Sequence, residues 1–198
     1  TTLGIMLIIL SIKNMEKYIY YAHKKGFVDI MTNTNGSPIT PKRSKKILDS
    51  GLTRLRFSLD AFTDETYKKV RVGAIDLERV KKNIFTFLEL KEKGGYKLPV
   101  VGVSFCKLKQ NMHEINKFKK FWKDKVDLVS VQTFVPPTQN KKAYFDFYPE
   151  DQFYTEENIN FRCNQPFQRI QIRNQEIFPC CYSIVMGDKG TKNYKDFV

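Results

Sequence analysis

Three of the four cysteines in this 198-residue chain lie in one short segment near its end. Cys163 comes first, and the adjacent pair Cys180 and Cys181 directly follows Pro179. Thiolates are the usual ligands of iron in iron–sulfur clusters, and cysteines presented by a hairpin can converge on one cluster. Reduced structural thiols are the alternative. We expect Cys163, Cys180 and Cys181 to bind a metal cluster, with Cys181 ranked after the other two because neighbouring residues do not readily point at one iron.

The fourth cysteine, Cys106, ends an apolar run that begins at Val100. Cysteine often behaves as a small hydrophobic residue in such positions. We therefore expect a structural role for Cys106 rather than metal ligation.

Polar residues also follow three apolar runs, at Thr34-Asn35-Gly36, Ser58-Leu59-Asp60 and Gln132. Loops at the carboxyl ends of parallel strands commonly carry function in α/β proteins. The first two sites also have simpler interpretations. Asn-Gly is a common turn dipeptide, and Ser58 or Asp60 could cap the next helix.

An apolar run, a turn and an amphipathic helix recur along the first 135 residues. This alternation predicts parallel strands with helical crossovers, in a barrel or an open doubly wound sheet. Asn14 is expected to cap one helix, and Asn111 with Glu114 has the spacing of a capping box for another. The strands are expected at residues 3–9, 27–33, 54–60, 100–105 and 126–134.

The order of these motifs resembles the radical SAM family: TNTNG, then SLD, then a Y-x-x-x-R helix, then ERVKKNI. The resemblance extends from about Met15 to Phe134. It implies an α/β fold, a partial (β/α)6 TIM-like barrel lacking its first unit, which holds S-adenosyl-L-methionine across its open top.

Carried over by position, the resemblance also assigns cofactor-binding residues. Ser58 and Asp60 would lie near the ribose or methionine moiety. Arg71 would face the methionine carboxylate, to which a planar guanidinium can bind bidentately. Asn35 and Gly36 would shape the turn bordering the cofactor. The resemblance assigns no catalytic residue.

The terminal segment resembles the start of a SPASM or Twitch extension, which binds an auxiliary iron–sulfur cluster. We expect a small cysteine-containing β-hairpin module there, with strands on either side of Arg173-Asn174. The expected domains are a partial barrel at 1–135, a linker at 136–160 and the module at 161–198.

The chain contains no C-x-x-x-C-x-x-C motif, which in this family supplies the ligands of the radical-generating [4Fe–4S] cluster. We therefore expect a chain truncated at both ends and inactive alone. Its full-length form would cleave S-adenosyl-L-methionine reductively, with electrons from a partner such as a flavodoxin or ferredoxin. It would then abstract hydrogen from a peptide or small-molecule substrate, with help from an auxiliary cluster. The alternative is a degenerate, non-catalytic barrel that binds a peptide or nucleotide.

The formal net charge of +13 raises the question of nucleic acid. The lysines are spread along the chain without a dense basic run, so a nucleic-acid partner is not expected. The apolar run at residues 3–10 is much shorter than the roughly 20 residues that span a bilayer, and a buried strand is expected instead. With no secretory leader and no disulfide framework, a cytoplasmic protein is expected.

Overall fold

Five parallel strands form one sheet in the computed structural model, and they are ordered in space as they are in the chain. The structure describes residues 4–8, 14–134, 146–149, 171–173 and 176–178. Each neighbouring pair of strands is parallel, as the alternating pattern predicts. The strands are β1 (Gly4–Ile8), β2 (Asp29–Thr34), β3 (Arg54–Ser58), β4 (Val100–Lys107) and β5 (Leu128–Thr133).

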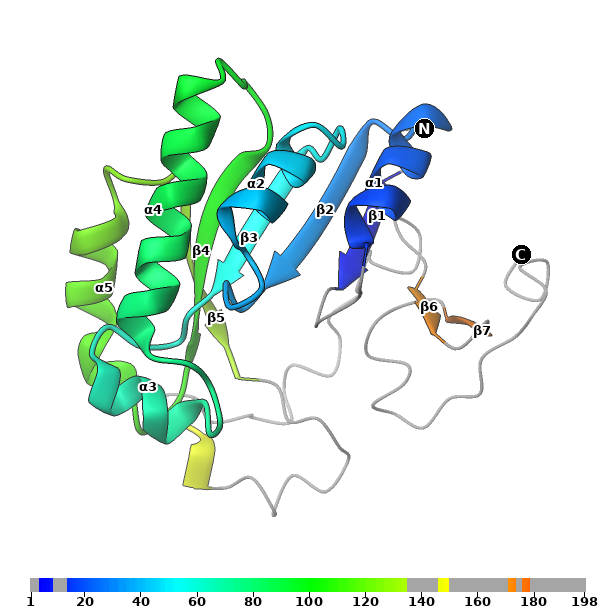
Figure 1. Ribbon diagram of the computed structural model, residues 1–198. Coiled ribbons are helices and arrows are strands. Elements are labelled where there is room, and N and C mark those ends of the chain that lie inside the picture. Colours follow the sequence, from blue (N-terminus) through cyan, green and yellow to red (C-terminus); the bar gives the residue numbers. More distant parts are fainter. Residues whose placement is uncertain (1–3, 9–13, 135–145, 150–170, 174–175, 179–198) are drawn as a thin grey trace.

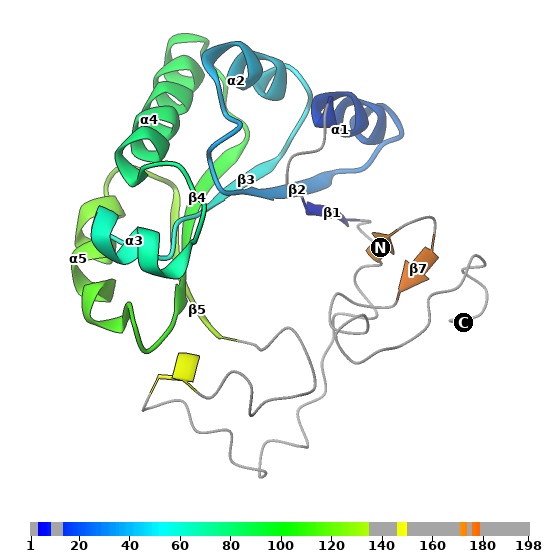
Figure 2. The same cartoon turned by 60° about the horizontal axis from the view of Figure 1, so that its bottom comes forward.

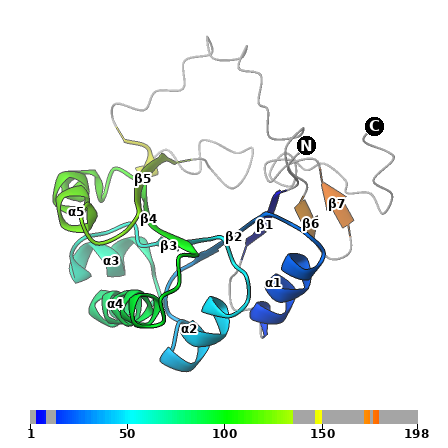
Figure 3. The same cartoon turned by 90° about the horizontal axis from the view of Figure 1, so that it is seen from above.

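The connecting helices all cover the same, outer face of the curved sheet (Figures 1 and 3). None of the described α-helices lies on the inner, concave face. The helices are α1 (Met15–Lys24), α2 (Pro41–Leu48), α3 (Asp64–Val70), α4 (Leu77–Lys93) and α5 (Ile115–Trp122), with a short 3-10 helix η1 (Met112–Glu114) before α5. This arrangement of one-sided helices on a curved parallel sheet is that of a partial TIM-like barrel.

The core lies between the sheet and these helices. Apolar residues at helical spacing on α4 and α5 pack against alternate residues of the central strands. Phe105 contacts Phe118 edge-on, with ring centroids 5.0 Å apart. Phe57 and Phe87 meet in the same manner at 6.1 Å. These contacts fix β3 and β4, whose carboxyl ends carry the residues of interest.

Helix ends only partly follow the sequence prediction. Thr40 caps α2 through a hydrogen bond from Arg43 N, and Pro41, which suits the first helical position, occupies the first turn. Asn14 does not cap α1, because its backbone is left-handed (φ 61°) and its side chain makes no cap hydrogen bond. The predicted capping box at Asn111 is also wrong, since its side chain makes no cap hydrogen bond.

Near the carboxyl terminus, β6 (Gln171–Arg173) pairs antiparallel with β7 (Glu176–Phe178). Figure 2 shows this two-stranded element in orange. A strand was expected on either side of Arg173-Asn174. β7 lies where the second was expected, whereas Arg173, expected in the turn, belongs to β6. The predicted ligands Cys163, Cys180 and Cys181 lie outside the described residues.

None of the described helices combines the length and apolar character needed to cross a membrane.

Candidate active-site edge of the sheet

The two faces of the sheet differ in character. On β2, Thr32 and Thr34 are buried against the helices, while Met31 and Asn33, which alternate with them, are half-buried on the opposite face. Successive strand residues point to opposite faces, so Met31 and Asn33 belong to the concave side. The same alternation on β3 places Arg54, Arg56 and Ser58 there.

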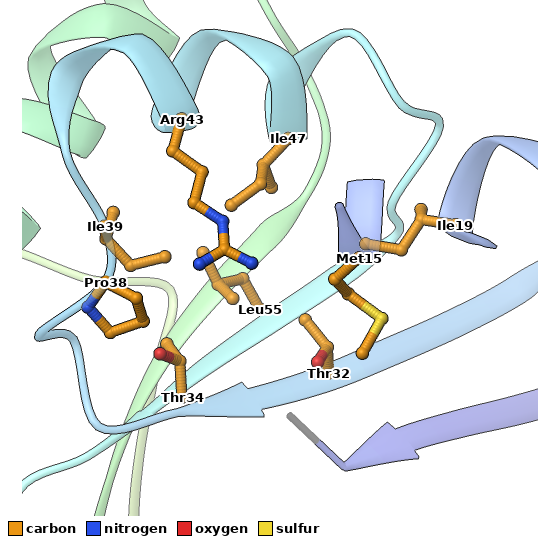
Figure 4. A pocket seen from close by; sticks show the side chains of 9 residues that line it. All are labelled: Met15, Ile19, Thr32, Thr34, Pro38, Ile39, Arg43, Ile47 and Leu55. Carbon is orange, nitrogen blue, oxygen red and sulfur yellow. The ribbon is translucent and has the colours of Figure 1, made fainter. Parts of the chain in front are cut away.

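The small cavity in Figure 4 lies on the helix-covered face and is not the candidate site. It is a packing gap beneath α2, with an almost entirely apolar lining. Its lining residues are Met15, Ile19, Thr32, Thr34, Pro38, Ile39, Arg43, Ile47 and Leu55. None of the predicted cofactor-binding residues contributes to it.

Polar contacts instead follow the concave face from one end of the strands to the other. Basic and hydroxyl side chains of β3 meet polar partners on the strands beside it. The contacts are the ion pair of Arg54 with Asp29, the bond from Arg56 Nε to Asn33 Oδ1 (3.0 Å) and the bond from Ser104 Oγ to Ser58 Oγ (3.3 Å). The last of these lies at the carboxyl ends of β3 and β4.

Asp60 is the centre of the group at this edge. Its backbone is left-handed, with φ 60°, which is uncommon for a residue other than glycine but tolerated by aspartate. Its Oδ1 accepts a hydrogen bond from Cys106 N at 2.7 Å. Its Oδ2 accepts two bonds from Arg71, from Nε at 3.1 Å and Nη2 at 2.6 Å. The carboxylate therefore joins the end of β4 to the end of α3.

Arg71 reaches this edge because it is the C-cap residue of α3. Its side chain is 23% exposed and that of Asp60 is 16% exposed, so the pair is neither sealed in the core nor freely solvated. A guanidinium has five N–H donors in a planar fork, more than the two bonds to Asp60 use. The fork held by Asp60 can therefore also bind a carboxylate or phosphate.

The structure excludes the simpler interpretation of Ser58 and Asp60 as helix caps. The N-cap of α3 is Thr63, whose side chain accepts a hydrogen bond from Thr66 N at 3.3 Å. Ser58 and Asp60 precede the helix and contact β4 instead. Three of the five predicted cofactor-binding residues, Ser58, Asp60 and Arg71, are thus brought to one edge.

The other two predicted residues, Asn35 and Gly36, form the turn after β2, the strand beside β3. Asn35 Oδ1 accepts hydrogen bonds from the backbone N (3.1 Å) and hydroxyl (2.7 Å) of Ser37. Gly36 O accepts one from Asn83 Nδ2 on α4 at 3.0 Å. These contacts define the shape of the turn and attach it to α4. They are all contacts within the protein, and the role of the turn in cofactor binding stays a prediction.

Replacing Gly36 with alanine is expected to destabilise the protein by about 3 kcal/mol. Its φ of +79° costs an alanine about 1–2 kcal/mol. The added Cβ would also lie 2.7 Å from Val80 Cγ1, and overpacking of this kind costs about 1–3 kcal/mol. The free energy of unfolding in urea measures the effect.

Gly73 provides the matched control, because its φ is also +79° but a Cβ there would meet nothing within 4 Å. Gly73→Ala should therefore cost only about 1 kcal/mol, the conformational part. Equal losses in the two variants would contradict the close packing of the turn on α4.

Cys106 follows the last core residue of β4. It is half-buried at the concave edge, while its neighbour Phe105 belongs to the core. Burial, and secondarily the charge of Asp60, raise the pKa of the Cys106 thiol to about 11. The protonated thiol is a poor nucleophile and a poor metal ligand.

Two residues at this edge were not predicted as functional. Asn111 is fully buried, and Glu114 is 3% exposed. Their three-residue spacing matches a capping box, and this pattern assigns both residues to the start of a helix. In the structure their side chains reach instead to the loop between β3 and α3. Only the folded arrangement of two distant segments reveals these contacts.

The residues at this edge fit one of the two expected cofactors. A guanidinium, a carboxylate and two serine hydroxyls are suitable partners for the amino-acid and ribose groups of S-adenosyl-L-methionine. They do not fit the radical-generating cluster. Cys106 is the single cysteine among the described residues, and this part of the chain contains no group of three His, Cys, Asp or Glu side chains able to hold a metal ion.

Comparison with curated proteins finds relatives among proteins named as probable GTP 3',8-cyclases. One from Methanococcus maripaludis (strain C5 / ATCC BAA-1333) is 28% identical over 149 residues, covering 75% of this chain and 46% of the relative. One from Methanocaldococcus jannaschii is 27% identical over 117 residues, covering 59% of this chain and 37% of the relative. The chain thus spans less than half the length of these relatives.

Among solved structures, Streptococcus suis SuiB bound to precursor peptide SuiA matches with a TM-score of 0.65 at 12% identity, over 94% of this chain and 51% of that one. SuiB bound to S-adenosylmethionine matches with a TM-score of 0.64 at 13% identity, over the same shares of both chains. At these identities the likeness shows the fold alone, an α/β fold with a parallel sheet.

The sequence profile described as the radical SAM superfamily matches residues 7–121, which is more than half of the chain. The match contains β2 to β4, Asp60 and Arg71. The chain therefore belongs to the radical SAM superfamily, whose cofactors are S-adenosyl-L-methionine and a [4Fe–4S] cluster.

Proposed function

We propose that this chain is the S-adenosyl-L-methionine-binding part of a radical SAM enzyme. The observation that carries the proposal is the Asp60–Arg71 pair at the carboxyl edge of β3 and β4. In the parallel sheets of α/β proteins, ligands bind at this edge of the strands. Asp60 orients the guanidinium, Arg71 binds the methionine carboxylate, and Ser58 lies beside them for the ribose.

The activity belongs to the full-length protein. Its reaction is reductive cleavage of S-adenosyl-L-methionine followed by hydrogen abstraction from a peptide or small-molecule substrate. An auxiliary iron–sulfur cluster is held by the segment that contains Cys163, Cys180 and Cys181. The names of the relatives support two substrate classes, since GTP is a nucleotide and the peptide bound by SuiB is a precursor peptide.

A titration of the chain with S-adenosyl-L-methionine, followed by calorimetry, tests the proposal. Arg71→Leu should weaken binding about 10- to 100-fold, because a hydrogen bond to a charged group contributes about 1.5–3 kcal/mol. Arg54→Leu is the matched control. Arg54 lies on the concave face of the sheet, at the end of β3 away from Ser58, and is paired with Asp29. Its replacement should leave the affinity for S-adenosyl-L-methionine within about threefold of the original value.

Equal affinities in the two arginine variants would refute the assignment of Arg71. Absence of binding in the unmodified chain would refute the proposal itself. It would favour the second candidate, a non-catalytic barrel that binds a peptide or nucleotide. The absence of C-x-x-x-C-x-x-C from these 198 residues is the observation behind that candidate. Protein that stays free of iron after reconstitution but retains a peptide would support it.

A further inference from the structure

Two buried polar side chains connect the segment after β4 to the loop between β3 and α3, which carries Asp60 of the proposed cofactor-binding pair. Asn111 and Glu114 come from the turn and 3-10 helix between β4 and α5. Both are almost completely removed from solvent, at 0% and 3% exposure. Buried amide and carboxylate groups are stable only when they are hydrogen-bonded. Their partners therefore indicate what they do.

Asn111 links the ends of two strands. Its Nδ2 donates to Asp60 O at 2.8 Å and to Cys106 O at 2.9 Å. Its Oδ1 accepts from Leu108 N at 2.7 Å, which fixes the amide's own orientation. The bond to the Asp60 carbonyl holds that residue in its left-handed conformation. Because the backbone conformation sets the direction of the side chain, Asn111 determines where the Asp60 carboxylate lies.

Glu114 holds the N-terminal end of α3, the helix that follows the loop with Asp60. Its Oε2 accepts from Phe62 N at 2.7 Å and Thr63 N at 3.4 Å. Its Oε1 accepts from the hydroxyls of Thr63 and Thr66, the latter at 3.0 Å. Thr63 is the N-cap of α3, and Arg71 is the C-cap of this seven-residue helix. Anchoring one end of so short and rigid a helix fixes the position of the other.

The charge state of Glu114 suits this function. Burial alone would raise the pKa of Glu114, but the hydrogen bonds from Phe62 N and from Thr63 and Thr66 outweigh burial and hold the pKa below its ordinary value. The side chain is therefore a carboxylate at neutral pH, able to accept from all of its donors at once.

We propose that Asn111 and Glu114 are positioning residues that fix the Asp60–Arg71 pair at the edge of the sheet. Asn111 sets the carboxylate and Glu114 sets the helix that delivers the guanidinium. If the two residues had a purely structural role, replacing them would lower the stability of the protein without changing the geometry of the Asp60–Arg71 pair. The consequence for S-adenosyl-L-methionine rests on the proposed function, but the consequence for the pair itself does not.

The experiment compares Glu114→Ala, Asn111→Ala and the conservative Glu114→Gln in the full 198-residue chain. The amide side chain of the Glu114→Gln variant would keep one oxygen for the backbone N–H groups and could donate to a threonine hydroxyl. Thr53→Val is the matched structural control. Thr53 links β2 to β3 through a bond from Ile30 N (2.8 Å) at the opposite end of these strands.

The first readout is the Nε–Hε resonance of Arg71 in nitrogen-15 NMR spectra, assigned by its loss in Arg71→Lys. Hydrogen exchange of this proton should be slow in the unmodified chain, because Nε donates to Asp60. Glu114→Ala and Asn111→Ala should accelerate the exchange about tenfold or more, while Glu114→Gln and Thr53→Val should preserve it. The second readout is the dissociation constant of S-adenosyl-L-methionine, expected to rise about tenfold in the two alanine variants alone.

The two readouts separate the two proposals. A changed Arg71 exchange rate in a chain that binds no S-adenosyl-L-methionine would support the positioning role and refute the proposed function. An exchange rate in folded Glu114→Ala and Asn111→Ala equal to that of the unmodified chain would refute the positioning role, whatever the affinity for the cofactor. Equal acceleration of the exchange in Thr53→Val would also refute the positioning role. Any loss of stability would then be enough to expose the Arg71 proton.

Discussion

Anaerobic reconstitution with iron and sulfide is expected to give a coloured protein whose iron content depends on Cys163 and Cys180 but not on Cys106. Replacing Cys163 or Cys180 with alanine should abolish the visible iron–sulfur absorbance. The reason is that a cluster is held by thiolates, and a site with few cysteines cannot lose one and still retain the metal. Cys181→Ala should have a smaller effect, because neighbouring residues rarely bind the same iron.

Cys106→Ala is the matched control for this experiment. Burial and the Asp60 carboxylate raise the pKa of the Cys106 thiol to about 11, so that the thiolate needed for iron binding is scarce at neutral pH. Its iron content should therefore equal that of the unmodified chain. Iron loss in Cys106→Ala, or equal iron content in all four variants, would contradict the predicted auxiliary site. Chelation followed by dialysis should return the unmodified protein to the colourless state.

The sequence was sufficient to predict the sheet and most of its carboxyl edge. Apolar runs separated by amphipathic helices predict parallel strands wherever the chain is long enough for a crossover, and all five strands of the main sheet occur near their expected positions. Ser58 and Asp60 could be predicted because polar residues directly after a buried strand lie at that edge. Arg71 followed from the family resemblance rather than from local pattern.

The roles of Asn111 and Glu114 could not be predicted from local sequence. Both residues satisfy a capping-box spacing, and such a pattern gives no sign that its side chains will be used elsewhere. Their partners Asp60 and Thr63 lie 51 positions earlier in the chain. Competition between a cap and a distant hydrogen bond is decided by the packing of the β3–α3 loop against the segment after β4, which only the folded chain specifies.

Asp60→Ala is expected to lower the free energy of unfolding by about 3 kcal/mol. The substitution leaves Cys106 N without its acceptor, and a buried unsatisfied donor costs about 1–3 kcal/mol. It leaves the half-buried Arg71 guanidinium without its carboxylate. It also replaces aspartate, which tolerates a left-handed backbone, with alanine, which tolerates it less well, at the φ of 60°.

Asp29→Ala is the control that separates the site from an ordinary ion pair. Asp29 also pairs with an arginine across neighbouring strands, but its side chain is 37% exposed and that of Arg54 is 49% exposed. Exposed pairs contribute about 0–1 kcal/mol, so this variant should lose little stability. Asp60→Asn should fall between the two, because asparagine tolerates the left-handed backbone and keeps an oxygen for Cys106 N but loses the charge that holds Arg71.

Urea unfolding at neutral pH measures all three variants, and a titration with S-adenosyl-L-methionine completes the comparison. Equal losses of stability in Asp60→Ala and Asp29→Ala would mean that the Asp60–Arg71 pair is an ordinary surface contact. A large loss of stability in Asp60→Ala, together with weaker cofactor binding in the better-folded Asp60→Asn, would mean that the carboxylate has two roles. It would stabilise the end of β4 through Cys106 and, separately, hold Arg71 in the orientation that binds the ligand.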